Sequence, residues 1–167
     1  MDNNLVLIGM PGSGKSTVGQ MLAQKCGAVF VDLDTVIEET AGKSIPHIFA
    51  EDGELAFRDL EQKCAQEASR RSGQVIATGG GIILREANMK ALSENGVIVF
   101  LDRPVADILG ENLSGRPLLA DDVTRIYRLY EDRIGLYRRY SQIAVENRTT
   151  PEDAAKIILD EVRRMEK

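Results

Sequence analysis

The chain has 167 residues, of which 43% are hydrophobic and 28% charged, and its formal net charge is −5 at pH 7. This length predicts one domain over residues 1–167 with a proper core, and the negative charge argues against a broad nucleic-acid-binding surface. No apolar stretch of the sequence approaches the ~18 residues of a membrane span, and the first residues do not resemble a signal peptide, so we expect a cytoplasmic protein without membrane or nucleic-acid partners.

Short apolar runs alternate with helical patterns along the chain. The runs predicted to be strands are residues 5–8, 29–31, 75–77, 97–101 and 143–145, and the fourth is continuously apolar, as in a strand covered on both faces. Helices are predicted over residues 15–25, 35–40, 54–71, 86–94, 105–109, 123–140 and 151–165. This alternation predicts an α/β fold, in which a parallel sheet lies between two layers of helices.

The first predicted strand leads into a glycine-rich loop. Residues 9–17 read GMPGSGKST, which matches the phosphate-binding P-loop pattern G-x-x-x-x-G-K-[ST] between a strand and a helix. In such a loop, backbone N–H groups and the helix N-terminus bind an anion, Lys15 reaches the β- and γ-phosphates, and the Ser16 hydroxyl ligates Mg²⁺. The alternative is a glycine turn before a structural helix. The joint match of Gly9, Gly14, Lys15 and Ser16 favours a nucleoside triphosphate site.

Two further groups of residues follow the second and third predicted strands. Asp32 and Asp34 come after the second strand, and Gly79-Gly80-Gly81 come after the third. Ligands gather at the carboxyl ends of parallel strands, so these groups are candidates for the same site as the P-loop. One carboxylate suits Mg²⁺ and the other suits a substrate hydroxyl, although Asp34 alone would equally well cap the next helix. The glycines allow close approach to a ligand, or else a tight turn.

Three arginines are candidate anion-binding residues. Taken alone, Arg58 is predicted to be a surface residue that pairs with acidic neighbours on its own helix. Arg133 belongs to a basic helix, and the simplest interpretation is that this face of the helix is exposed to solvent. Arg116 differs because it lies in residues 110–122, GENLSGRPLLADD, which contain glycines and a proline. We expect this stretch to be a mobile lid over the site. A guanidinium there would close onto the charge of a transferring phosphate.

Six segments occur in one order along the chain: GMPGSGKST, DLD, FRDLE, TGGG, GRPLL and R-x-x-L-Y. In order and spacing they resemble the shikimate kinase family, and the resemblance covers essentially the whole chain. It implies a nucleoside-monophosphate-kinase-like P-loop fold of three α/β/α layers with a five-stranded parallel sheet. It also implies ATP-dependent phosphorylation of the 3-hydroxyl of shikimate to give shikimate 3-phosphate and ADP, a step of chorismate and aromatic amino acid biosynthesis.

The resemblance also implies roles for individual residues. It assigns catalysis to Lys15, Asp34 and Arg116. It assigns Mg²⁺ to Ser16 and Asp32. It assigns ATP to Gly12, Ser13, Gly14, Lys15, Ser16, Thr17 and Arg116. It assigns shikimate to Asp34, Arg58, Gly79, Gly80, Gly81 and Arg133, with the two arginines on the shikimate carboxylate. This set makes chemical sense, because arginines and glycine N–H groups suit a small carboxylate and Asp34 suits a polyol.

One expected residue is missing, and two other functions compete. Members of the family often have an arginine near Leu109 or Gly110 that stacks on adenine; this chain has none, and we expect Arg148 to supply the contact. The expected partners are ATP and shikimate, bound to a monomer.

A gluconate-kinase-like enzyme is the first alternative function. It would share Lys15 and Ser16 but would not need the proposed acceptor-binding residues Asp34, Arg58 and Arg133. A nucleotide-binding regulatory module without turnover is the second alternative.

Overall fold

Five parallel strands form the centre of the molecule. The computed structural model describes residues 3–112 and 120–167. The strands stand in the order β2-β3-β1-β4-β5, and every neighbouring pair is parallel. Their bounds are β1 Asn4–Ile8, β2 Val29–Asp32, β3 Gln74–Ala77, β4 Gly96–Asp102 and β5 Ile143–Glu146. The five predicted strands are therefore all present, each one or two residues longer than expected, and the predicted parallel sheet is confirmed.

Each central strand contributes side chains to two separate cores. Val6 and Ile8 of β1 belong to one hydrophobic cluster, while Leu5 and Leu7 belong to the other. Successive side chains of a strand point to opposite faces, so an unbroken apolar strand requires cover on both sides. The continuous apolar run in β4 divides in the same way.

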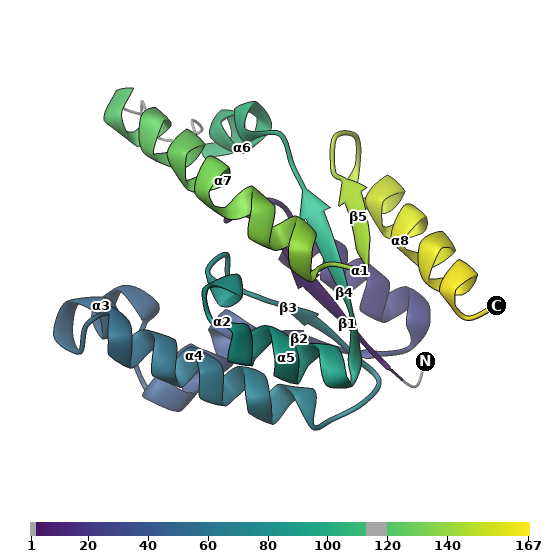
Figure 1. Ribbon diagram of the computed structural model, residues 1–167, viewed down its shortest axis with the longest axis horizontal. Helices are drawn as coiled ribbons and strands as arrows, with labels where there is room; N and C mark the ends of the chain where they lie inside the picture. The colour runs from purple at the N-terminus through teal and green to yellow at the C-terminus, as the bar shows by residue number, and fades with distance from the viewer. Residues whose placement is uncertain (1–2, 113–119) are drawn as a thin grey trace.

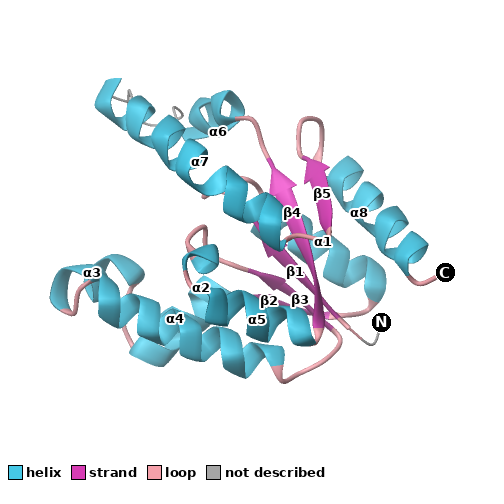
Figure 2. Ribbon diagram, viewed as in Figure 1, coloured by secondary structure: helices cyan, strands magenta, loops and turns pink. Residues whose placement is uncertain are grey.

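Helices cover both faces of the sheet (Figures 1 and 2). On one face lie α1 (Lys15–Cys26) and α8 (Pro151–Met165), which carry the second cluster. The other face carries α2 (Leu33–Ala41), α4 (Glu54–Ser69), the short 3₁₀ turn η1 (Ile82–Leu84), α5 (Glu86–Glu94) and α7 (Ala120–Tyr140). Next to these, α3 (Ile45–Glu51) packs on α4, and α6 (Val105–Asn112) packs on α7.

Several element bounds differ from the predictions. The helix α3 was not predicted; it is a short helix capped by Ser44, with a proline in its first turn. Residues 110–112 end α6 and residues 120–122 begin α7, so both ends of the expected loop 110–122 are helical. The rest of that stretch, including Arg116, lies outside the described residues. The predicted cap of the last helix is confirmed, because the Thr150 side chain accepts a hydrogen bond from the Asp153 N–H.

The strand order indicates where a binding crevice can form at the carboxyl ends of the strands. The central strand β1 has β3 on one side and β4 on the other. The chain leaves β1 towards α1 on one face, whereas α2, α4 and α5 follow β2 and β3 on the opposite face. In open α/β sheets a crevice forms at such a switch point, outside the carboxyl ends of the strands. The P-loop follows β1 at this point.

One glycine in α7 provides a stability test. Gly135 lies exposed in the interior of the 21-residue helix, five residues before its end, and a Cβ added there would meet no atom within 4 Å. Because glycine costs about 1 kcal/mol relative to alanine in a helix interior, we expect Gly135→Ala to raise the melting temperature by about 2–4 °C. The contrasting variant is Gly19→Ala in α1, whose Cβ would lie 2.7 Å from Phe30 Cε2, and it should lower the melting temperature. Thermal unfolding followed by circular dichroism measures both, and a lower value for Gly135→Ala would contradict the assignment of a regular helix there.

Candidate active site

The P-loop wraps around the start of α1. Gly14 precedes the helix with φ 95°, a left-handed conformation that glycine adopts readily. A Cβ on Gly14 would lie 2.7 Å from Asn147 Nδ2, the group that donates to the Ser13 carbonyl over 2.9 Å. The loop after β5 therefore supports the P-loop from one side, and glycine is required at this contact.

Lys15 is largely buried within the loop. Its Nζ donates to the Gly9 carbonyl over 2.7 Å and to the Met10 carbonyl over 2.8 Å. Burial lowers the pKa of Lys15 from 10.5 to about 8, and the negative charge of Asp34 partly opposes this shift. The ammonium group is thus held by carbonyl oxygens of the P-loop, and because the side chain is buried, little water surrounds it.

A cleft of about 870 Å³ extends from the P-loop in both directions. Asp32, Asp34, Thr78, Gly79 and Gly80 line one part of it. Another part is lined by Arg103 after β4, by residues of α6, by the loop after β5 and by the start of α8. Besides Arg103, these residues are Ala106, Asp107, Gly110, Glu111, Asn147, Arg148, Thr149 and Pro151. Three of the predicted groups therefore contribute to one cleft: the P-loop, the two aspartates, and Gly79 and Gly80 of the glycine triplet.

Asp32 contacts both the P-loop and the next helix. Its Oδ2 accepts from the Ser16 hydroxyl over 2.8 Å. Its Oδ1 accepts from the backbone N–H groups of Asp34 (3.1 Å) and Thr35 (3.3 Å). Asp32 is therefore the N-cap of α2, and the cap role that the sequence left open for Asp34 belongs to its neighbour.

Asp34 is left free to face the glycine triplet. It lies in the first turn of α2, and a Cβ on Gly79 would lie 2.9 Å from its Oδ1. Burial, followed by the nearby Asp32 charge, raises the pKa of Asp34, while Lys15 lowers it. The carboxylate of Asp34 is thus a partly desolvated base close to the P-loop lysine.

A side chain at each glycine of the triplet would collide with a different neighbour. Next to the Asp34 contact of Gly79, a Cβ on Gly80 would lie 2.6 Å from Pro11 Cδ and 3.2 Å from Arg133 Nη1. A Cβ on Gly81 would lie 2.5 Å from Arg58 Nη1. The triplet therefore does more than make a turn, because these close contacts leave no room for side chains. Arg58 and Arg133 do not line the cleft itself but lie against the triplet at its edge.

Arg58 is held by two carboxylates of its own helix. Its Nη1 lies 2.8 Å from Glu61 Oε1, and its Nε lies 3.7 Å from Glu54 Oε1. The sequence predicted such pairs with acidic neighbours on the same helix, but it predicted them at the solvent-exposed surface, whereas Glu61 is only 1% exposed. Burial raises the pKa of Glu61, and Arg58 opposes the shift. Sequence reasoning missed Glu61 as a site residue, although its spacing of three from Arg58 placed it on the same helix face.

Two arginines occupy the other end of the cleft. Arg148, the expected adenine contact, lines the cleft but is exposed, and its Nε pairs with Glu146 at 2.6 Å. Arg103 was not predicted; its guanidinium binds both oxygens of Glu111 at 2.7 Å and donates to the Gly12 carbonyl over 3.0 Å. Its place one residue after β4, at the carboxyl edge of the sheet, was the available signal.

Two features are absent from the described residues. Within residues 3–112 and 120–167, no three His, Cys, Asp or Glu side chains converge to form a metal cage. In the same ranges, no helix combines the length and apolar character needed to cross a bilayer.

The pKa of Lys15 predicts how the reaction depends on pH. Because the pKa is lowered to about 8, the amine is largely neutral above that pH and attracts phosphate poorly. We expect kcat/KM for the nucleotide to fall about tenfold per pH unit on the alkaline side. Initial rates at low nucleotide concentration measure this. A rate that stays constant up to the ordinary lysine pKa would contradict a desolvated Lys15 at the phosphates.

The comparisons with known proteins agree along nearly the whole chain. A family model described as shikimate kinase matches residues 11–163. The shikimate kinase of Clostridium botulinum (strain Eklund 17B / Type B) is 39% identical over 165 residues, covering 96% of this chain and 99% of the relative. That of Thermodesulfovibrio yellowstonii is 41% identical over 167 residues, covering 97% and 96%.

Solved structures point the same way. The shikimate kinase from Acinetobacter baumannii, in complex with shikimate, superposes with a TM-score of 0.91 at 34% identity, covering 98% of this chain and 94% of that one. A gluconokinase from Sinorhizobium meliloti 1021 has a TM-score of 0.64 at 18% identity, which shows a shared fold alone. With a P-loop, an acidic residue and a glycine triplet in one cleft, and with these matches, the chain belongs to the shikimate kinase family and is a kinase with the P-loop kinase fold.

Proposed function

We propose that the cleft transfers the γ-phosphate of ATP to the 3-hydroxyl of shikimate, giving shikimate 3-phosphate and ADP. The observation that carries this proposal is the gathering of Asp34, Arg58 and Arg133 around the glycine triplet. Two guanidinium groups beside one carboxylate suit an acceptor that has both an acid group and hydroxyls. Lys15 lies close enough to Asp34 for each charge to shift the pKa of the other, which suits a γ-phosphate between them.

The nucleotide would occupy the P-loop and the end of the cleft next to α6. In this assignment Gly12–Thr17 bind the phosphates through backbone N–H groups, with Lys15 on the β- and γ-phosphates. Arg148 lines the end of the cleft where the adenine would lie. Arg116, which is outside the described residues, would reach the phosphates from the lid.

The acceptor would lie against the glycine triplet. Arg58 and Arg133 would bind its carboxylate through charge-assisted hydrogen bonds, and backbone N–H groups of Gly79–Gly81 would complete this wall. Asp34 would accept a hydrogen bond from the 3-hydroxyl. Glu61 holds Arg58 in place, because the two form a buried ion pair of 2.8 Å.

Ser16 of the P-loop and the neighbouring Asp32 are suitable ligands for Mg²⁺. The Ser16 hydroxyl and Asp32 Oδ2 lie 2.8 Å apart, so two hard oxygen ligands converge beside the phosphate-binding loop. Magnesium usually binds through one or two protein oxygens together with substrate phosphates and water, which explains why three acidic residues are not needed. When bound, the ion would neutralise charge on the β- and γ-phosphate oxygens.

The reaction then needs one group that accepts a proton and one positively charged group that stabilises the phosphates. As the 3-hydroxyl oxygen forms its bond to the γ-phosphorus, its proton passes to the Asp34 carboxylate, and the bond from the γ-phosphorus to the bridging oxygen of ADP breaks. Lys15 stabilises the negative charge that shifts onto the β-phosphate. Asp34 releases its proton to water when shikimate 3-phosphate leaves.

A substrate panel tests the proposal. ADP formation is measured with purified protein and ATP, with no acceptor, with shikimate, with gluconate, or with a nucleoside monophosphate, each in the presence of Mg²⁺ or excess EDTA. We expect shikimate to be by far the best acceptor and EDTA to stop the reaction. A clear preference for gluconate would instead support the alternative kinase that shares the P-loop.

The proposal includes a monomeric enzyme in the cytoplasm. Both proposed substrates are small molecules. Both cysteines, Cys26 and Cys64, are free thiols, which suits a reducing compartment. Light scattering coupled to size-exclusion chromatography tests the first part, since a mass near twice the 18.4 kDa of the chain would contradict it.

A further inference from the structure

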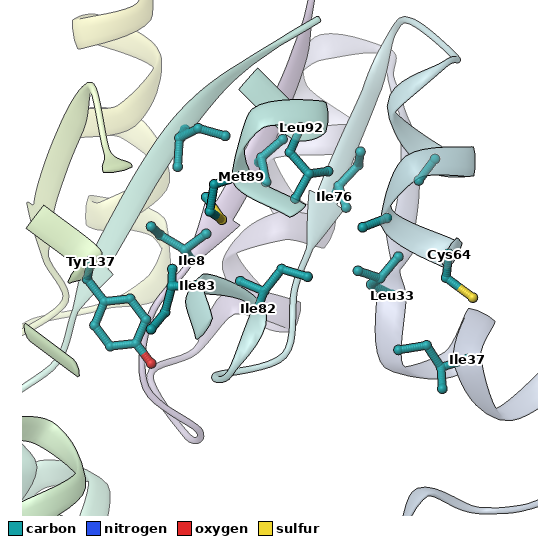
Figure 3. Close-up of a cluster of buried hydrophobic side chains, with 14 of the residues drawn as sticks. Ile8, Leu33, Ile37, Cys64, Ile76, Ile82, Ile83, Met89, Leu92 and Tyr137 are labelled. Atoms are coloured by element: carbon teal, nitrogen blue, oxygen red, sulfur yellow. The ribbon is translucent and has the colours of Figure 1, made fainter. Parts of the chain in front are cut away.

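One buried hydroxyl group links α7 to the glycine triplet. Tyr137 is fully buried, and its ring stacks on Phe100 with centroids 5.1 Å apart and planes 15° apart. Figure 3 draws this ring at one end of the hydrophobic cluster that contains Ile8 and Ile83. The Tyr137 hydroxyl donates to the Gly80 carbonyl over 2.6 Å. The ring therefore belongs to the hydrophobic core, but its hydroxyl reaches the glycine triplet, the wall against which the acceptor is proposed to lie.

The same hydroxyl also lies near a proposed substrate residue. Arg133 stands four residues earlier on α7, on the same helix face, and its Nη1 would lie 3.2 Å from a Cβ on Gly80, the residue whose carbonyl accepts from Tyr137. Burial raises the pKa of Tyr137, with Arg133 opposing the shift, so the phenol stays protonated. It donates to the Gly80 carbonyl and keeps its own lone pairs as acceptors for an N–H of Arg133. One oxygen atom thus lies close to two parts of the proposed acceptor site, the Gly80 peptide and Arg133.

The hydrogen bond to Gly80 fixes the direction of a peptide. The Gly80 carbonyl and the Gly81 N–H belong to one trans peptide unit and point in opposite directions. Within the described ranges, the Gly81 N–H makes no backbone hydrogen bond. A peptide between two glycines can rotate at little steric cost. Anchoring its carbonyl to α7 therefore keeps the Gly81 N–H turned to the side opposite Tyr137.

We propose that Tyr137 is a positioning residue for the acceptor site: its hydroxyl holds the Gly80–Gly81 peptide with the Gly81 N–H presented to the acceptor, and it aligns Arg133. This inference rests on the proposed function, because it assumes that shikimate lies against the triplet. It adds a residue outside the cleft that acts through the peptide and through Arg133, without touching the substrate.

The direct test is Tyr137→Phe. The variant keeps the ring and its stacking on Phe100 but leaves the Gly80 carbonyl without its donor and lets the peptide rotate. We expect the KM for shikimate to rise about five- to thirtyfold, the KM for ATP to stay within about twofold, and kcat to change less than the shikimate KM. The matched control is Tyr130→Phe on the same helix, which loses a hydroxyl bonded to Asp102 at 3.3 Å and should leave the shikimate KM unchanged.

A second measurement uses the unaltered protein. In ¹⁵N-labelled protein, shikimate should shift the Gly81 amide resonance if this N–H faces the acceptor. An unmoved Gly81 resonance, an unchanged shikimate KM in Tyr137→Phe, or equal rises in both KM values would each overturn the inference. Failure of the proposed function looks different, since the unaltered protein itself would then form no ADP in response to shikimate.

Discussion

Replacing Lys15 by methionine is expected to remove phosphoryl transfer almost completely while the protein stays folded. The Lys15 Nζ is anchored to the Gly9 and Met10 carbonyls at the mouth of the loop, so it needs little rearrangement to meet a phosphate. A cation preorganised in this way acts on charge that develops in the transition state. Loss of one such donor lowers kcat by about 10²–10³-fold, and the full loss of a charge should reach at least that range.

The measurement is ADP formation at saturating concentrations of both substrates. The control is Lys90→Met, which removes an exposed lysine from α5 on one face of the sheet. Thermal unfolding of both variants separates lost chemistry from lost structure. Near-normal turnover in Lys15→Met with intact folding would remove the P-loop lysine from the mechanism.

The second large effect is expected for Asp34→Asn. Asparagine keeps the size of the side chain and one acceptor oxygen but cannot take up the proton of the hydroxyl. A general base contributes about 10²–10⁴-fold, so kcat should fall by that factor while the KM for shikimate changes little. Arg58→Ala should behave in the opposite way, because it removes a proposed ligand of the shikimate carboxylate. Its shikimate KM should rise about ten- to a hundredfold.

The Asp34 variant also tests the coupling between the two proposed substrate sites. The Asp34 charge opposes the lowering of the Lys15 pKa, so its removal should move the alkaline limb of the nucleotide profile to lower pH. Asp160→Asn on α8, a partly exposed residue paired with Arg163, serves as the charge control and should leave both kcat and the profile unchanged. Full turnover in Asp34→Asn would place the acceptor base elsewhere.

Much of the site was predictable because its signals are local in sequence. The P-loop is one continuous segment between a strand and a helix, so its pattern fixed both its place and its phosphate-binding character. The alternation of strands and helices then placed Asp32, Asp34 and the glycine triplet at one edge of the sheet. The choice between Asp32 and Asp34 as helix cap was not predictable, because both stand next to the helix start and only the backbone geometry decides.

Other features depend on contacts between distant segments. Nothing in the sequence around Glu61 indicates that it is buried, since FRDLE also suits an exposed helix face. The Tyr137 hydroxyl meets the Gly80 carbonyl 57 positions earlier in the chain, a contact that only the packing of α7 over η1 produces.

If the proposed acceptor site is correct, the glycine triplet limits how acceptor preference can change, whether in evolution or by engineering. A larger side chain at any of the three positions would displace a different neighbour: Asp34, Pro11 or Arg58. Mutation of this wall can therefore only remove space, and each change disturbs its own partner. A variant that accepts a bulkier hydroxy acid must instead gain room from α2 or α7, the helices that carry Asp34 and Arg133. Libraries for altered acceptors should leave residues 79–81 constant.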